Sequence, residues 1–330
     1  MEFNFSPTPQ KAEPTGDQPV KVLVIGSGPA GLAAALYAAR AELNPLVLTG
    51  MELHGQAALT NTIENYPGFP DGVGGAELGD LFQKQAERFG ARVEFDTVES
   101  VDLSVRPFVV KAYNQVYQAD TLIISTGASS NRLGVPGETE LIGKGVSYCA
   151  TCDGWFFKNK KVVVVGGGDS ALEEALFLTR YASTVTVIHR RDALRAGAIL
   201  QRRAAENSKV KFIYNAVVTD VIGSDAVTAV RLRDVKTGET REHPTDGVFI
   251  FIGHTPNTSL FKGQVDMDER GYIRTNSLME TNVPGVYAAG EVADPNFRQV
   301  ITSAGMGAAA AMRAVHFLES SHSEKVTASV

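Results

Sequence analysis

Cysteine is scarce in this chain, which has two in 330 residues, and there is only one tryptophan. Two cysteines cannot build the disulfide framework of a small secreted domain, so a reducing cytoplasm is the expected setting. No apolar run approaches the roughly 20 residues of a membrane span. The 37 acidic and 31 basic residues nearly balance, and the net charge of −6 argues against broad nucleic-acid binding. These scarcities indicate a soluble, mildly acidic globular protein that is long enough for two domains.

A CxxC motif contains both cysteines, which lie three positions apart in the segment 149–153. Thiols at this spacing can close a small disulfide on a turn or a first helical turn, where helix-terminal N–H groups favour a reactive thiolate on Cys149. Asp153 adds a group that could move a proton to or from a leaving thiolate. Half of a zinc site and two unrelated buried thiols are the alternatives, although zinc takes four ligands and the sequence has no second CxxC. The motif predicts a redox-active disulfide, for which the rest of the chain must supply electrons.

A first dinucleotide-binding fingerprint follows the β-branched run at 21–25. The sequence GSGPAG at 26–31 comes directly after this predicted strand and opens an alanine-rich predicted helix. In such units Gly26 permits the tight turn, Gly28 lets a pyrophosphate approach the backbone, and Gly31 lets helix and strand pack closely. A tight turn without a ligand is the alternative, but the flanking strand and helix favour a dinucleotide.

Weaker signals follow the second predicted strand, at 45–48. Glu52 stands near the position where the fingerprint expects an acidic ribose partner, and a surface glutamate is an equal alternative. The turn-rich segment 54–70 could line a flat aromatic ring or simply connect two elements. We interpret 91–95 and 108–112 as strands of a small sheet.

The same pattern begins again at 161–171, where a β-branched strand is followed by GGGDSA and a predicted helix. This GxGxxA sequence is a second dinucleotide fingerprint. The next strand, 184–188, ends in the sequence HRR at 189–191, with Arg195 four residues on. Arginines at this position suit a ribose 2′-phosphate, whereas an acidic residue would bind a bare 2′-OH. We therefore expect the second site to prefer NADPH over NADH, with a solvated basic cluster as the alternative.

Each nucleotide-binding unit closes with a strand that runs into a glycine, at 120–127 in the first and 246–253 in the second. The chain therefore contains an internal repeat of domain size. A further apolar strand leads to Gly290 and Glu291, and a final predicted helix at 305–319 begins with small residues. Because small residues permit close backbone approach, we expect this last segment to return and complete the first domain.

In the content and order of its motifs, the chain resembles the low-molecular-weight, bacterial-type thioredoxin reductases over about residues 21–320. The motifs that carry the resemblance are Gly26–Gly31, Glu64–Gly68, Cys149–Gly154, Gly166–Glu174, His189–Asp192, Gly253–Asn257 and Arg298–Thr302. The resemblance implies an α/β fold of two Rossmann-like, three-layer ββα nucleotide-binding domains, the second inserted into the first. We expect a disordered tail at 1–19, a first FAD-binding part at 20–131, an NADPH-binding domain carrying the CxxC motif at 132–258, and a second FAD-binding part at 259–330.

The resemblance also implies two cofactor sites and no metal site. FAD would be bound by Gly26, Ser27, Gly28, Pro29, Ala30, Gly31, Met51, Glu52, Gly55, Gln56, Asn65, Val98, Thr126, Gly127, Ala128, Gly290, Glu291, Arg298, Gln299 and Val300. NADPH would be bound by Gly166, Gly168, Asp169, Ser170, Ala171, Glu173, His189, Arg190, Arg191 and Arg195.

The implied activity is reduction of a thioredoxin disulfide by NADPH, through FAD and the two cysteines, in a cytoplasmic homodimer. Cys149 would attack the partner disulfide, Cys152 would face the flavin, and Asp153 would serve as the acid. Because nicotinamide and cysteines share the inserted domain, we expect that domain to rotate about hinges near 131–133 and 256–260. A reductase using another donor such as ferredoxin, and a non-enzymatic flavoprotein redox sensor, are the alternatives. The arginines disfavour the first and the cysteines the second.

Three positions depart from the usual pattern of these reductases. His54 stands where the family normally has the first glycine of Gly-Gly-Gln, Glu291 replaces the usual aspartate, and Ala308 takes a place where many members carry cysteine. Glutamate is one methylene longer than aspartate, which could shift its contact with the ribityl chain of FAD. None of the three departures removes a redox group.

Overall fold

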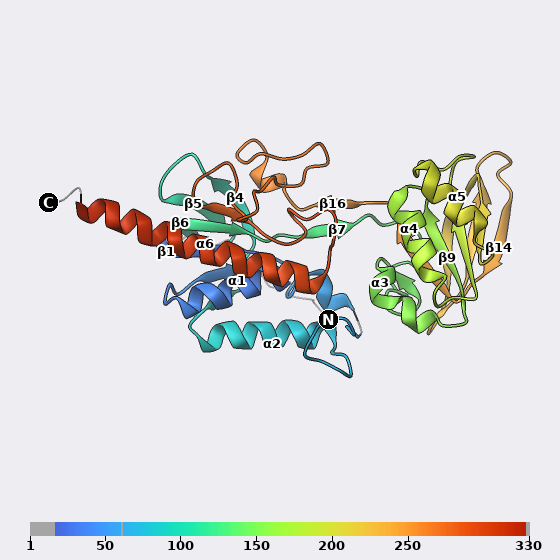
Figure 1. Cartoon of the computed structure of the whole chain (residues 1–330), viewed down its shortest axis with the longest axis horizontal. Helices are drawn as coiled ribbons and strands as arrows, with labels where there is room; N and C mark the ends of the chain where they lie inside the picture. The colour runs from blue at the N-terminus through green and yellow to red at the C-terminus, as the bar shows by residue number, and fades with distance from the viewer. Residues whose placement is uncertain (1–16, 61, 328–330) are drawn as a thin grey trace, which may run out of the picture. The chain divides into compact units, whose positions relative to one another are not determined.

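A computed structural model describes residues 17–60 and 62–327 of the chain, which folds into two compact units (Figure 1). Unit 1 comprises the described residues up to Thr60, Val73–Ser129 and the segment from Pro256 onwards. Unit 2 comprises Ser130–Thr255 and the described residues 62–72, although residues 62–72 fall within the predicted first FAD-binding part. This division into compact units does not test the domain limits expected from the sequence, which stay predictions. Most of the expected tail lies outside the described residues, and strand β1 already begins at Asp17.

Unit 1 is built on a seven-stranded sheet in the order β3-β2-β1-β6-β5-β4, with β17 also paired to β6. The strands are β1 (Asp17–Ile25), β2 (Leu46–Leu48), β3 (Arg92–Glu94), β4 (Val98–Asp102), β5 (Phe108–Ala112), β6 (Val116–Ile124) and β17 (Val286–Ala288). The helices are α1 (Pro29–Arg40), α2 (Gly75–Arg88) and α6 (Val300–Thr327), with short 3-10 turns at Gln56–Leu59 and Ser259–Phe261. The expectation of a small sheet at 91–95 and 108–112 was wrong: β3 pairs parallel with β2 and β5 pairs antiparallel with β6, so both strands belong to the seven-stranded sheet.

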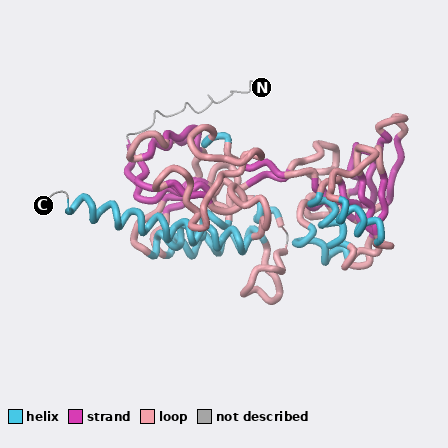
Figure 2. Tube along the Cα trace, turned by 45° about the horizontal axis from the view of Figure 1, so that its top comes forward, coloured by secondary structure: helices cyan, strands magenta, loops and turns pink. Residues whose placement is uncertain are grey.

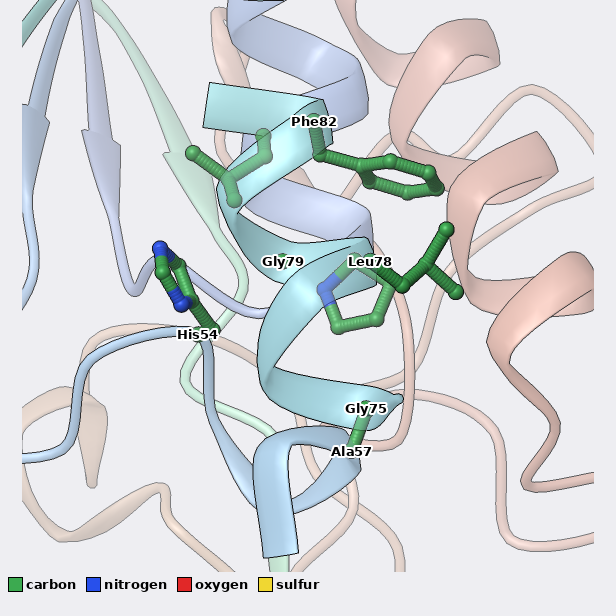
Figure 3. A pocket seen from close by; sticks show the side chains of 8 residues that line it. His54, Ala57, Gly75, Leu78, Gly79 and Phe82 are labelled. Atoms are coloured by element: carbon green, nitrogen blue, oxygen red, sulfur yellow. The ribbon is translucent and has the colours of Figure 1, made fainter. Parts of the chain in front are cut away.

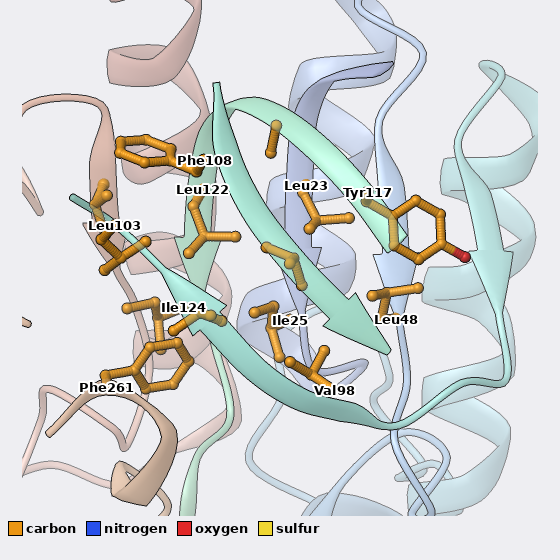
Figure 4. Close-up of a cluster of buried hydrophobic side chains, with 14 of the residues drawn as sticks. Leu23, Ile25, Leu48, Val98, Leu103, Phe108, Tyr117, Leu122, Ile124 and Phe261 are labelled. Carbon is orange, nitrogen blue, oxygen red and sulfur yellow. The ribbon is translucent and has the colours of Figure 1, made fainter. Parts of the chain in front are cut away.

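Strand β1 lies between β2 and β6 and is buried on both faces, because a separate core covers each side of the sheet. Val22 and Val24 face the helices, in a core made largely of alanines from α1 and α6. Leu23 and Ile25 point to the opposite face, into a core shared with β4, β5 and Phe261 (Figure 4). Side chains alternate between the two faces of a strand, so burial of both faces produces a continuous apolar run in the sequence.

Helix α6 returns the chain to α1 and begins at Val300, earlier than the predicted start at 305. The two helices lie side by side in Figures 1 and 2. A Cβ added at Gly307 of α6 would come within 1.9 Å of the carbonyl oxygen of Ala30 in α1. The helices therefore meet backbone to backbone, which explains the small residues at the start of α6.

We expect Gly307→Ala to destabilise unit 1 by about 1–3 kcal/mol, because the new methyl group has to push two buried helices apart. Gly305→Ala is the matched control on the same helix, since a Cβ there would meet no described atom within 4 Å. The control should gain about 0.5–1 kcal/mol from its lower backbone entropy in the unfolded chain. Urea unfolding midpoints of both variants test this contrast, and equal shifts of the same sign would contradict the packing described.

Unit 2 repeats the layering with a five-stranded parallel sheet in the order β11-β10-β9-β15-β8. Its strands are β8 (Val146–Ser147), β9 (Lys161–Gly166), β10 (Thr184–Ile188), β11 (Val210–Ile213) and β15 (Gly247–Phe251). Helices α3 (Ala150–Asp153), α4 (Asp169–Leu178) and α5 (Ala198–Glu206) and a 3-10 turn at Gly154–Phe157 complete this part. A second, antiparallel sheet contains β12 (Ala216–Gly223), β13 (Val227–Asp234) and β14 (Thr240–Pro244).

The strand β9 again separates two cores. Val162 and Val164 pack with α4 and α5, whereas Val163 and Val165 pack with residues of β12 and β13 such as Val218. Helices, parallel sheet and antiparallel sheet thus form three layers, and the predicted α/β fold of two Rossmann-like domains is confirmed. Within residues 17–60 and 62–327, no helix has both the length and the apolar content needed to cross a membrane.

Besides the two ends of the segment 62–72, the chain passes from one unit to the other at 129/130 and at 255/256. The two passing strands, β7 (Ala128–Ser130) and β16 (His254–Pro256), pair with each other. On the unit 1 side, the Asn257 amide nitrogen donates to the Thr126 carbonyl at 2.9 Å, and the Thr126 hydroxyl donates to the Asn257 carbonyl at 2.7 Å. The predicted hinges lie next to these crossings.

Candidate functional site

The glycine-rich turn of unit 1 joins β1 to α1, and each of its three glycines has a different surrounding. Gly26 has φ +107°, and a Cβ there would lie 2.4 Å from the Ser125 carbonyl oxygen. A Cβ at Gly31 would lie 1.9 Å from the Gly26 carbonyl oxygen. At Gly28 the same atom would meet nothing described within 4 Å. Two glycines thus permit tight packing, and the middle one leaves room for a ligand beside the backbone.

The turn of unit 2 joins β9 to α4 in the same way. A Cβ at Gly166 would lie 2.5 Å from the Phe251 carbonyl oxygen and 2.6 Å from the side chain of Ala171, whereas at Gly168 it would meet no described atom within 4 Å. Neither α1 nor α4 has a side-chain cap among the described residues at its N-terminus. Free N–H groups at a helix N-terminus suit a phosphate, so both turns have the open backbone that a dinucleotide requires.

The loop that follows β2 packs against the turn of unit 1. A Cβ at Gly55 would come within 3.2 Å of the Gly28 Cα. The backbone N–H of His54 donates to the buried Ser27 hydroxyl at 3.1 Å. The C-terminal segment arrives from the other direction, where a Cβ at Gly290 would lie 2.9 Å from the Ala30 side chain. The predicted FAD residues 26–31, 55 and 290 are therefore neighbours, and Thr126 follows Ser125, which contacts Gly26.

Further residues predicted to bind FAD have surroundings other than the glycine-rich turn. Met51 is 75% exposed, and the carboxylate of Glu52 accepts a hydrogen bond from the amide of Gln56 at 2.9 Å. Val98 is a buried residue of β4, and Asn65 belongs to the segment grouped with unit 2. For these residues a role in binding FAD stays a prediction.

Asp294 shapes the loop before α6, and the sequence reading missed it. Its buried carboxylate accepts hydrogen bonds from the backbone N–H groups of Asn296 at 2.9 Å, Phe297 at 3.0 Å and Arg298 at 3.1 Å. These bonds hold Arg298 at φ +52°, next to the predicted FAD residues Gln299 and Val300. The Asp-Pro-Asn sequence at 294–296, a typical turn sequence, was the available signal.

Glu291 carries the most strongly perturbed carboxyl of this loop. Burial raises its pKa to about 7, the nearby Asp294 adds to the rise, and Arg298 opposes it. The sequence reading singled out Glu291 for its length. The structure adds that this carboxyl changes its protonation state near neutral pH.

The stability of the protein should therefore depend on pH through Glu291. Because the folded-state pKa lies above the ordinary value of 4.5, the native state holds this proton more tightly than the unfolded chain does. This contribution, at most about 3 kcal/mol, is fully present below pH 4.5 and is lost as the pH rises through 7. Glu291→Gln has an uncharged amide and should abolish this pH dependence, so the variant gains stability relative to the parent as the pH rises from 4.5 to 7. Unfolding midpoints measured from pH 4 to 9 on nucleotide-free protein provide the test; a constant difference would contradict it.

An arginine-bearing loop is attached to the turn of unit 2. The backbone N–H groups of Arg195 and Ala196 donate to the Gly167 carbonyl at 2.7 and 3.1 Å, and the carboxylate of Asp169 accepts from Gly197 N–H at 2.7 Å. Arg190, Arg191 and Arg195 themselves are exposed. The fold thus brings together the two halves of the predicted NADPH site, the glycine turn and the arginines. Ser170 and Glu173 lie on α4 and are also exposed.

His189 lies beneath the same turn. A Cβ at Gly167 would come within 2.3 Å of its Nδ1 atom, so only glycine fits at 167. Burial lowers the pKa of His189, and the charges of Arg195 and Arg191 lower it further. Its Nε2 atom has no hydrogen-bond partner among the described residues. His189 therefore supports the turn as a neutral, buried ring.

The two cysteines of the CxxC motif form a disulfide, with their Cα atoms 5.3 Å apart. Cys149 caps the short helix α3, and its sulfur accepts a hydrogen bond from the Cys152 N–H at 3.2 Å. Ser147 braces the same turn, because its hydroxyl donates to the Cys149 carbonyl at 3.2 Å and accepts from the Cys149 N–H at 3.1 Å. Burial raises the pKa of Asp153, and a hydrogen bond with Ser147 opposes the rise. The predicted disulfide is confirmed, and Ser147 is an additional residue that the motif did not reveal.

Comparisons with known proteins agree with this geometry. Residues 20–307 match the model of the family described as pyridine nucleotide-disulphide oxidoreductase. Thioredoxin reductase of Coxiella burnetii is 49% identical, over 91% of this chain and 96% of the relative. That of Rickettsia bellii is 52% identical, over 90% of this chain and 98% of the relative.

Solved structures give the same result. The crystal structure of thioredoxin reductase from Streptococcus pyogenes is 43% identical with a TM-score of 0.88, covering 92% of this chain and 100% of that one. Thioredoxin reductase from Giardia duodenalis is 39% identical with a TM-score of 0.86 over the same shares. The resemblance inferred from the motifs is therefore confirmed. The chain belongs to the pyridine nucleotide-disulphide oxidoreductase family, among the thioredoxin reductases.

Proposed function

We propose that this protein reduces the disulfide of a thioredoxin, using NADPH as electron donor and FAD as the intermediate carrier. The observation that carries the proposal is the Cys149–Cys152 disulfide, in a chain whose two other conspicuous sites are open glycine-rich turns. The names of relatives about half identical over most of their length support thioredoxin as the substrate. A ferredoxin-dependent enzyme would not need the arginine loop bonded to Gly167.

The residues present fit both nucleotides. In unit 1 the open backbone at Gly28 and the uncapped start of α1 suit the pyrophosphate of FAD, with the loop at 290–300 completing the site. In unit 2 the open backbone at Gly168 suits the pyrophosphate of NADPH, and the exposed arginines suit its 2′-phosphate. When bound, FAD would supply the means of taking a hydride from NADPH and passing its electron pair to the disulfide.

The chemistry of this chain's own residues begins with the reduced motif. Two electrons and two protons convert the Cys149–Cys152 disulfide into two thiols. The Cys149 thiolate attacks one sulfur of the partner disulfide, forming a mixed disulfide and releasing the other partner sulfur as a thiolate. Cys152 then attacks the sulfur of Cys149, which restores the internal disulfide and releases the second partner thiolate. Asp153, whose pKa burial raises, can hold the proton that a released thiolate takes.

Exposed apolar side chains and the strands that join the two units support three further parts of the proposal: partner binding, rotation of unit 2 and dimer formation. Trp155 and Phe156, which begin three positions after Cys152, are 51% and 43% exposed and offer apolar surface to a protein partner. Unit 2 is proposed to rotate about the paired strands β7 and β16, where the chain crosses between the units, from one electron-transfer task to the other. We also propose that the protein works in the cytoplasm as a homodimer; the exposed apolar side chains of Leu59 and Phe297 in unit 1 support the dimer.

The test is a reconstitution with purified protein. The protein should be yellow, NADPH but not NADH should bleach it rapidly, and oxidised thioredoxin should restore the colour. Bleaching by reduced ferredoxin alone would favour the alternative donor. A bleached flavin that thioredoxin cannot reoxidise would contradict the proposed substrate.

A further inference from the structure

His54 occupies a backbone conformation that favours glycine. Its φ is +63°, and the next residue, Gly55, has φ +66°. Left-handed backbone is uncommon for residues other than glycine and costs free energy unless the surroundings compensate. His54 is nevertheless only 5% exposed, so its side chain is held firmly inside unit 1.

The compensating contacts come from α2. The His54 Nε2 atom lies 3.0 Å from the Gln83 Oε1 atom and 3.8 Å from a carboxylate oxygen of Asp80. Gln83 is held in turn, because its amide nitrogen donates to the carboxylate of Glu87 at 2.7 Å. The imidazole is therefore the first member of a chain of polar groups along α2.

Gly79 makes room for the imidazole. A Cβ at this position would lie 2.4 Å from the His54 Cγ atom and 2.5 Å from its Cβ atom. A glycine inside a helix costs roughly 1 kcal/mol relative to alanine. Figure 3 shows the ring of His54 beside α2 at Gly79, on the wall of a small cavity that Leu78 and Phe82 also line. The left-handed His54 and the helical Gly79, each unfavourable by itself, thus fit against each other.

The same residue touches the glycine-rich turn through its backbone. The His54 N–H donates to the buried Ser27 hydroxyl at 3.1 Å, and Gly55 packs on Gly28. His54 therefore connects α2, through its side chain, to the turn, through its backbone.

We propose that His54 is a positioning residue that fastens the loop after β2 to α2 and so holds the pyrophosphate site of FAD in its binding shape. This inference rests on the proposed flavin function. A glycine at position 54 would suit the backbone but would leave the loop without its attachment to α2. The histidine costs backbone strain, but its contacts with α2 keep the loop in the shape that binds FAD. Its removal should therefore weaken FAD binding without weakening the fold.

The test measures FAD affinity by titrating the apoprotein and following the quenching of flavin fluorescence. His54→Gly and Gln83→Ala should each raise the FAD dissociation constant about fivefold to tenfold, the effect of one lost buried hydrogen bond. The double variant should show little further loss, because both changes break the same contact. Gln85→Ala, an exposed glutamine of the same helix, is the matched control and should bind FAD as the parent does.

Thermal unfolding of the apoproteins separates positioning from general stability. His54→Gly should unfold near the parental temperature, because relief of the left-handed strain offsets the lost contacts with α2. Unchanged FAD affinity in His54→Gly and Gln83→Ala would overturn the inference while leaving the proposed function intact. Additive losses in the double variant, or a loss that only follows a fall in unfolding temperature, would also overturn it. A parent protein that takes up no FAD would instead refute the flavin function, and this inference with it.

Discussion

Replacing Cys149 with serine should lower thioredoxin reduction about a thousandfold or more, while NADPH continues to bleach the flavin at the parental rate. The chain has only two cysteines, and the remaining one, Cys152, is assigned to the flavin side, so no third thiol can replace the attacking one. A serine hydroxyl is a poor nucleophile towards a disulfide at neutral pH. Stopped-flow absorbance of the flavin and a steady-state assay with oxidised thioredoxin measure the two half-reactions separately.

Cys152→Ser is the matched partner of this experiment, because it removes the other sulfur of the same disulfide. It should also stop turnover, yet it keeps the attacking thiol and should accumulate a mixed disulfide between Cys149 and thioredoxin. Intact-protein mass spectrometry detects that adduct. If Cys149→Ser formed the adduct and Cys152→Ser did not, the two assigned roles would have to be exchanged.

The double change of Arg190 and Arg191 to alanine should raise the KM for NADPH at least about a hundredfold and leave the KM for NADH nearly unchanged. Each arginine can give a 2′-phosphate a charge-assisted hydrogen bond worth about 1.5–3 kcal/mol, and NADH lacks that phosphate. Both side chains are exposed beside a loop whose backbone is bonded to the glycine-rich turn. Initial rates of flavin reduction over a range of each nucleotide measure the effect.

Arg202→Ala is the control for this prediction, since Arg202 is an exposed arginine of α5 in the same unit. It should change neither KM by more than about twofold, because it removes a charge without removing a contact to the nucleotide. Equal losses for NADPH and NADH in the double variant would mean that the arginines do not read the 2′-phosphate.

Local patterns were enough to predict much of the fold. The strand–glycine–helix units at 17–40 and 161–178 lie within short stretches of chain, where the glycines and the apolar runs act on their immediate neighbours. The mistake at 91–95 has the opposite cause. A three-residue strand can pair with several partners, and its pairing with β2 depends on how the intervening chain, which contains α2, folds between them. The sequence pattern of so short a strand does not indicate which strand it pairs with.

The sites divide in the same way. The CxxC spacing and the arginines at 190, 191 and 195 were enough to predict the proposed chemistry. Two cysteines at this spacing, and arginines at the end of the second strand of a dinucleotide fingerprint, each indicate a specific function. Sequence alone did not reveal that Ser147 braces the disulfide turn or that Asp294 shapes the loop before α6. Serine and aspartate are common residues. Only in the folded chain do backbone N–H groups lie close enough to donate to their side chains.

Residue order was thus sufficient to specify two open glycine-rich turns, a paired sulfur motif and the family to which the chain belongs, since each depends on neighbours a few positions apart. The attachment of His54 to Gln83 across Gly79, and the contact of Gly307 with Ala30, join residues that are far apart in the chain. Those contacts arise when packed helices and loops compete for the same space. Their geometry therefore depends on the completed core rather than on any single stretch of sequence.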